Sequence, residues 1–100
     1  MKLKVFSVYD SKAEAYLQPF FMPSRGSAIR AFTDSVNDPQ TGFHKHAADY
    51  TLFELGEYED SNAVFDLHQK PQLVANAAEL KEKPITTAPN NNMIDMKGDY

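Results

Sequence analysis

Two prolines four residues apart constrain the first third of the chain more than any other feature. Pro19 and Pro23 flank the residues Phe20-Phe21-Met22 in the stretch QPFFMP. Proline has no N–H group to donate and disfavours helical geometry in the residue before it, so a helix interior is excluded here. The stretch therefore predicts a short extended segment at the edge or end of a sheet. Because neighbouring strand side chains point to opposite faces, we expect one of Phe20 and Phe21 in the core and the other outside.

The residues after Pro23 predict a helix over about residues 27–37. Ser24 or Ser27 is a suitable N-cap, and apolar side chains then recur at helical spacing. The sequence NDP at 37–39 ends the helix. The free N–H groups at its start also suit a bound phosphate or carboxylate.

Alternating apolar and polar residues predict most of the sheet. Residues 2–9 (KLKVFSVY) are rich in β-branched and aromatic side chains, which favours a strand. Residues 50–58 and 63–68 alternate on either side of a four-residue loop, which predicts a β-hairpin. Gly56 suits a bulge in the first arm of that hairpin.

The remaining segments are more ambiguous. Residues 13–17 favour a short helical turn or irregular chain, and residues 38–49 favour a polar loop. Pro71 begins a segment whose apolar residues predict a last helix that reaches to about Lys83. Residues 84–100 are polar and rich in Asn and Pro, which predicts a tail that is flexible or docked on a partner.

This order of elements predicts an α+β fold. A small antiparallel sheet, made of the N-terminal strand, the short proline-flanked strand and the hairpin, is covered by one or two helices. The chain has 100 residues, so residues 1–83 are expected to form one small domain. There is no cysteine, which excludes disulfides and thiolate chemistry. We identify neither a signal peptide nor a membrane span, and we expect no membrane partner.

The charges are distributed unevenly along the chain. The formal net charge is −4, which argues against a strongly basic nucleic-acid binder. Residues 1–30 carry five basic and two acidic residues, whereas residues 31–100 carry five basic and 12 acidic residues. Such asymmetry is typical of a binding face or of subunits that attract each other, and a mixed solvated surface is the alternative.

Basic and aromatic residues in the N-terminal third form the main binding candidate. Aromatic side chains beside a track of positive charge are typical of proteins that bind single-stranded nucleic acid without sequence preference. The alternative is that some of these aromatic rings are core, because so small a domain needs its large apolar side chains. The candidate nucleic-acid-binding residues are Lys2, Lys4, Tyr9, Lys12, Tyr16, Phe20, Phe21, Arg25 and Arg30.

The sequence offers little support for an enzyme or a metalloprotein. His44, His46 and Asp49 resemble a metal clip, but a surface loop with two histidines is the simpler interpretation. The carboxylates of the predicted hairpin favour its solvated face, and His68 is interpreted as structural. We therefore expect no catalytic residues, no metal and no other cofactor.

Several distinctive phrases of the sequence resemble one family. YDSKAEAY, FFMP, AIRAF and DYTLFELG occur in the runs KVFSVYDSKAEAYLQPFFMPSRGSAIRAFTDSVND, DYTLFELGEYED and QLVANAAEL. Over roughly residues 1–80 these runs resemble the small nonstructural protein of gokushoviruses, which are single-stranded DNA bacteriophages of the Microviridae. The resemblance brings no catalytic residues with it.

The resemblance implies a nonstructural protein made in the host bacterial cytoplasm. This family is likened to protein C of the phiX-type phages, which diverts replication from duplex DNA to single strands for packaging. By analogy, the expected partners are single-stranded viral DNA and phage replication or capsid proteins.

Two functions are therefore expected. The first is an accessory protein of viral DNA replication and packaging that binds single-stranded DNA weakly. The alternative is a homodimeric protein-interaction module that acts on the replication initiator complex or the procapsid without contacting DNA. The acidic pI of about 5.2 favours the alternative.

Overall fold

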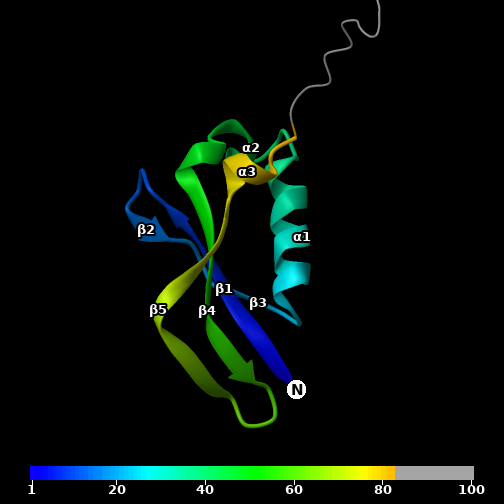
Figure 1. Cartoon of the computed structure of the whole chain (residues 1–100), viewed down its shortest axis with the longest axis vertical. Coiled ribbons are helices and arrows are strands. Elements are labelled where there is room, and N and C mark those ends of the chain that lie inside the picture. The colour runs from blue at the N-terminus through cyan, green and yellow to red at the C-terminus, as the bar shows by residue number, and fades with distance from the viewer. Residues whose placement is uncertain (83–100) are drawn as a thin grey trace, which may run out of the picture.

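The computed structural model describes residues 1–82, which form a curled antiparallel sheet with short helices (Figure 1). The predicted tail, residues 84–100, lies outside the described part of the chain. The elements in chain order are β1 (Lys2–Asp10), β2 (Ala15–Tyr16), β3 (Phe20–Met22), α1 (Arg25–Val36), α2 (Gly42–Lys45), the 3₁₀ helix η1 (Ala47–Asp49), β4 (Tyr50–Glu59), β5 (Val64–Asn76) and α3 (Ala77–Leu80). The expected α+β class is confirmed, with strands predominating over helices.

The N-terminal strand β1 organises the sheet. One of its edges pairs with both short strands, β3 near its start and β2 near its end, and its other edge pairs with β4. β5 pairs with the far edge of β4 and forms the outer strand. The predicted N-terminal strand, the short strand between the prolines and the hairpin are therefore confirmed.

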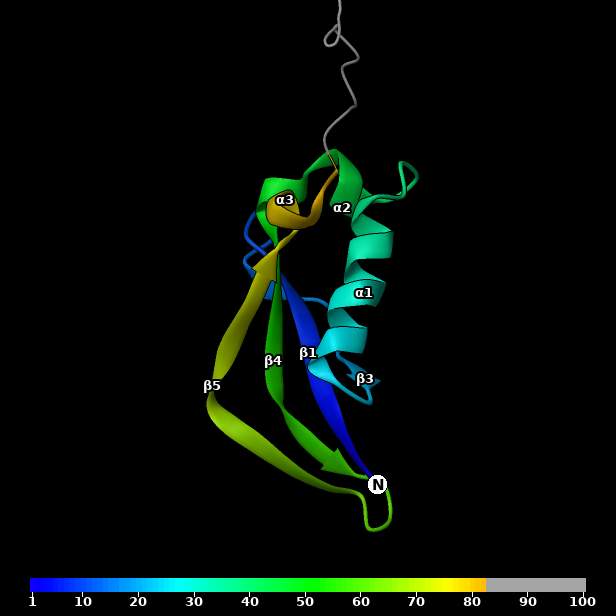
Figure 2. The same cartoon turned by 45° about the vertical axis from the view of Figure 1, so that its right-hand side comes forward.

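Helix α1 covers one face of the sheet. Figures 1 and 2 show it lying along the sheet, while α2 and α3 close one end of the molecule. Ser24 caps the helix: its side chain accepts from the Ser27 N–H, and the Ser27 side chain accepts in return from the Ser24 N–H. The helix begins two residues before the predicted start and ends one residue before the predicted end, so that prediction is confirmed within the usual error.

The hydrophobic core lies between α1 and the sheet. The strands contribute alternate side chains that point towards the helix, as strand geometry requires. The buried cluster consists of Phe6, Val8, Ala28, Phe32, Val36, Ala47, Leu52 and Ala77.

The predicted last helix is largely wrong. The second hairpin arm continues through Pro71 to Asn76, and only Ala77–Leu80 are helical. The reason is pairing with β4, which places Leu73 opposite Phe53 and satisfies the backbone along the strand. Pro71 is tolerated because it lies where the pairing of the two strands is interrupted.

Two smaller expectations also differ from the structure. The predicted turn at residues 13–17 contains the short strand β2, because Tyr16 pairs with Tyr9 of β1. The predicted polar loop at residues 38–49 contains α2 and η1. In α2 the Thr41 side chain supplies the cap by accepting from the His44 N–H.

Candidate docking face

The sheet separates Lys2 and Lys4 from most of the predicted aromatic rings. Because alternate residues of a strand share one face, Lys2 and Lys4 lie on the same side of β1 as Phe6, which is the side that α1 covers. There both lysines pair with Glu57, at 3.7 Å and 3.4 Å between nitrogen and oxygen. The strand order therefore places the acidic β4 directly beside the basic β1 and offsets the charge of both lysines.

The two arginines do not complete a basic track either. Arg25 Nε donates to Glu54 Oε1 at 3.1 Å, and Arg25 Nη2 donates to Gln72 Oε1 at 3.2 Å. Arg30 is exposed on α1. Lys12 is exposed in the turn between β1 and β2. The nine candidate residues thus do not form one surface.

The two phenylalanines between the prolines separate as predicted. Phe20 is half-buried and packs against the core, with its ring 5.8 Å from that of Phe6 between centroids. Phe21 is 41% exposed on the other side of the sheet. The pairing with β1 explains this split, because Phe20 lies opposite Phe6 and Phe21 lies opposite Val5.

The sheet face away from α1 carries most of the exposed aromatic surface. We call it the uncovered face, because no helix of residues 1–82 lies against it (Figure 2). Cross-strand pairing aligns its side chains in rows from β2 and β3 across β1 and β4 to β5. Its members are Tyr9, Tyr16, Phe21, Phe53, Tyr58, Phe65, Leu67 and Leu73.

The aromatic rings of the uncovered face form two clusters. Near the end of β1, Tyr16 lies 4.9 Å from Tyr9 and 5.7 Å from Phe53 between ring centroids. Near the hairpin loop, Phe21, Tyr58 and Phe65 contact one another at 4.7–6.1 Å. Such edge-to-face and tilted pairs stabilise a fixed arrangement of rings, so the face is a structured surface.

Aliphatic residues on β5 extend this surface. Leu67 and Leu73 are 59% and 65% exposed, and Phe65 is 51% exposed. A strand that presents so many large apolar side chains to water is typical of an interaction surface.

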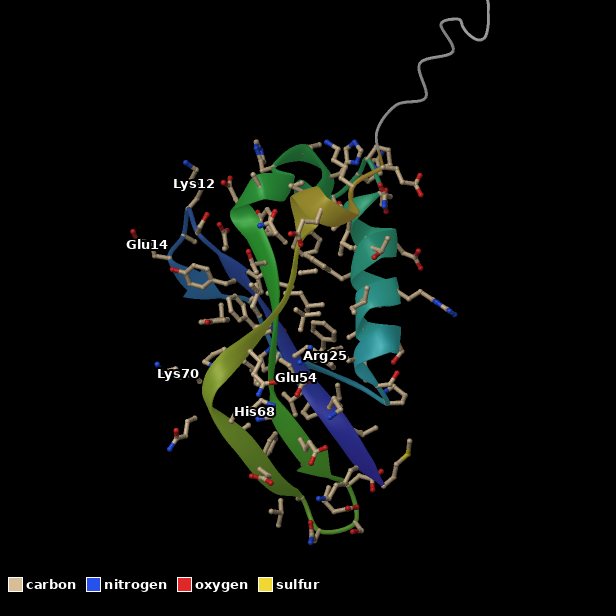
Figure 3. All side chains as sticks on the ribbon, viewed as in Figure 1. Lys12, Glu14, Arg25, Glu54, His68 and Lys70 are labelled. Carbon is tan, nitrogen blue, oxygen red and sulfur yellow. The ribbon has the colours of Figure 1, made fainter. Side chains whose placement is uncertain are left out.

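A buried carboxylate lies behind this face. Glu54 is only 4% exposed and accepts from both Arg25 and His68, whose Nε2 lies 2.7 Å from Glu54 Oε2. Figure 3 shows these three side chains converging from α1, β4 and β5. Burial alone would raise the pKa of Glu54, but the hydrogen bonds from His68 and Arg25 outweigh it and hold that pKa below its ordinary value.

Comparison with known families decides what kind of protein this is. The family model described as Phage ORF5 protein matches residues 3–80. The chain belongs to the Phage ORF5 protein family. It is therefore a bacteriophage protein. Searches of curated proteins and of solved structures find no match.

Two of the three histidines of this ORF5-family protein bind other groups of the chain, and His46 is exposed. His44 Nδ1 lies 3.1 Å from the Val36 carbonyl, and His68 binds Glu54. Within residues 1–82, no three or more His, Asp or Glu side chains are arranged to hold a metal ion. Among the helices of the same residues, none has the length and apolar character that crossing a membrane requires.

The Glu54 network is the feature that sequence reasoning missed. The sequence alone places Glu54 with the other carboxylates on the solvated face of the predicted hairpin, whereas the structure buries it. The alternation of side chains along β4 could have predicted this burial, because Glu54 lies on the same face of the strand as the core residue Leu52.

Proposed function

We propose that this ORF5-family protein is a phage accessory protein that acts by docking on other proteins through its uncovered face. The observation that carries the proposal is the exposure of large apolar side chains from β2, β3 and β5 on one side of the sheet. An apolar surface of this kind is most stable when a partner removes it from water.

The position of the charges supports a protein partner over DNA. Lys2, Lys4 and Arg25 are paired with carboxylates, so they offer little to a phosphate backbone. The net charge of −4 also opposes association with a polyanion.

The process that the docking serves is proposed from the resemblance to gokushovirus nonstructural proteins. We place the protein in replication or packaging of viral DNA in the host bacterial cytoplasm. Its expected partners there are the replication initiator complex or the procapsid. In this proposal it is a binding module that catalyses no reaction and needs no cofactor.

The proposal is tested by recovering partners from infected cells. A tagged full-length chain is crosslinked during infection, and the phage-encoded proteins recovered with it are identified by mass spectrometry. Phe65→Glu places a charge on the uncovered face at an exposed position, and Gln40→Glu adds the same charge in an exposed loop outside that face.

We expect a phage protein to be recovered with the unchanged chain and with Gln40→Glu. The recovery should fall at least tenfold with Phe65→Glu, because a buried charge in an apolar interface is costly. Equal recovery with both variants would refute the proposal.

Binding of single-stranded DNA is the second candidate function. Tyr16, Phe21 and Phe65 present exposed rings on a sheet whose other face a helix covers, an arrangement that allows bases to stack. Lys12 and Lys70 lie on the same side of the sheet (Figure 3).

Fluorescence anisotropy with a labelled oligonucleotide decides between the two candidates. If the protein docks only on proteins, it should show no saturable binding of the oligonucleotide at low salt. Saturable binding of the oligonucleotide that weakens steeply with salt and is lost in Phe65→Glu would favour DNA.

A further inference from the structure

We infer that the uncovered face is closed by a second copy of this chain, so that two sheets pack face to face in a symmetric dimer. The inference rests on the proposed docking function and names one partner for it. The area, the charges and the chemistry of the face support it in turn.

The area of the face matches what a dimer needs. Tyr16, Phe21, Phe65, Leu67 and Leu73 are 41–65% exposed. Given the surface of such side chains, the face exposes roughly 600 Å² of apolar surface, which is at the upper end for a lone monomer. A standard interface buries about 800 Å² per partner. The apolar patch therefore accounts for most of one side of a stable interface.

The charges around the face suit a self-complementary contact. Figure 3 shows Lys12, Glu14 and Lys70 on the side of the sheet away from α1. A rim of one sign would repel its own copy, whereas a rim of both signs lets a two-fold axis bring opposite charges together. The strongest positive groups of β1, Lys2 and Lys4, lie on the other face of the sheet and do not oppose this contact.

Packing of two sheets is a common solution for a sheet with one bare apolar face. Two sheets stack about 10 Å apart with their inner side chains interdigitating. Val5 lies opposite Phe21 and Ser7 lies opposite Phe53 in the strand pairing, and these two β1 residues are already only 2% and 1% exposed. The second copy would turn the two aromatic clusters into a shared core, which benefits a domain of this size.

The test is the mass of the full-length chain in solution. Sedimentation equilibrium at about 50 μM, above the micromolar-to-picomolar Kd range of standard-size interfaces, should give twice the chain mass of 11.3 kDa. Leu73→Glu and Leu67→Glu should each weaken the dimer at least tenfold. Gln40→Glu adds the same charge away from the face and should leave the dimer intact.

The exposure of the substituted side chains keeps this test decisive. Because Leu67 and Leu73 are more than half exposed, their replacement should leave the monomer folded, which circular dichroism checks. A monomeric unchanged chain, or a dimer that both face variants leave intact, would overturn the inference.

This outcome is separable from that of the proposed function. A monomer that still recovers a phage protein through Phe65 refutes the dimer and supports docking on other proteins. A dimer that Leu73→Glu dissociates, with no phage protein recovered from infected cells, supports the dimer and refutes the wider docking role.

Discussion

At the scale of single residues, Glu54 determines how the two layers are joined. Its carboxylate accepts from Arg25 at the start of α1 and from His68 on β5. One side chain thus ties the helix and the outer strand to the centre of the sheet. A buried carboxylate is costly unless its oxygens are paired, and both oxygens are paired here.

Removing this carboxylate should destabilise the domain. Glu54→Ala leaves Arg25 and His68 without their partner, but both are partly exposed and can regain water. We therefore expect a loss of about 2 kcal/mol in the free energy of unfolding, below the full cost of breaking a buried pair. Urea denaturation measures it. Glu57→Gln is the control, because the partly exposed pairs of Glu57 with Lys2 and Lys4 are worth less than about 1 kcal/mol. Equal losses in the two variants would contradict this account.

Two depressed carboxyl pKa values predict how stability depends on pH. The pKa of Glu54 lies below its ordinary value of 4.5, and hydrogen bonds from the Met1 amino group and Ser61 lower that of Glu59 to about 2. The unfolded chain therefore takes up protons near pH 4.5 before the folded chain does, so stability falls as the pH decreases below that value. Urea midpoints at pH 7, 4.5 and 3 should decline in this order, and Glu54→Gln should reduce the decline. A midpoint that is constant across this range would exclude the effect.

At the scale of elements, β5 shows where local sequence signals lose to tertiary pairing. Its residues after Pro71 have the spacing of an amphipathic helix, yet they extend along β4 because that strand needs a partner for its backbone. Helix α1 was predictable because its cap and its apolar spacing agree with its position in the fold. The split of Phe20 and Phe21 followed from strand alternation alone.

The bulge between β4 and β5 depends on a glycine, as the sequence suggested. Gly56 has φ +154°, and a Cβ there would lie 2.4 Å from the Asp66 carbonyl oxygen and 2.6 Å from the Leu67 Cα. The pairing of the two strands shifts register beside it. The backbone can adopt this close approach only without a side chain.

Gly56→Ala should therefore destabilise the domain severely. We expect a loss of about 3 kcal/mol or more, because the clash is with backbone atoms that cannot move aside. Gly26→Ala in α1 is the matched control, since its added Cβ would meet nothing closer than 3.9 Å. That change should leave stability equal or raise it by about 0.5 kcal/mol. Thermal denaturation compares the two, and a Gly56→Ala variant as stable as the unchanged domain would show that the strands can separate at the bulge.

At the scale of the whole molecule, the fold sorts the residues that looked like one binding surface into two. Charges that are 53 residues apart in the sequence, Lys4 and Glu57, become neighbours because β1 and β4 run side by side. The mostly basic residues 1–30 and the mostly acidic residues 31–100 therefore do not form two separate charged surfaces. What a single sequence could not reveal is which strands pair. This pairing exposes aromatic rings on the uncovered face and places Lys2 and Lys4 beside Glu57 on the other face.

The central claim is that the uncovered face is a docking surface for protein, and labelling of exposed side chains tests it most directly. Carbene footprinting compares the full chain in dilute purified solution with the same chain in an extract of infected cells. The account predicts that labelling of Phe65, Leu67 and Leu73 falls in the extract, while labelling of Arg30 and Asp34 on the exposed side of α1 is unchanged. Undiminished labelling of the three β5 residues, or protection of α1 instead, would contradict the claim.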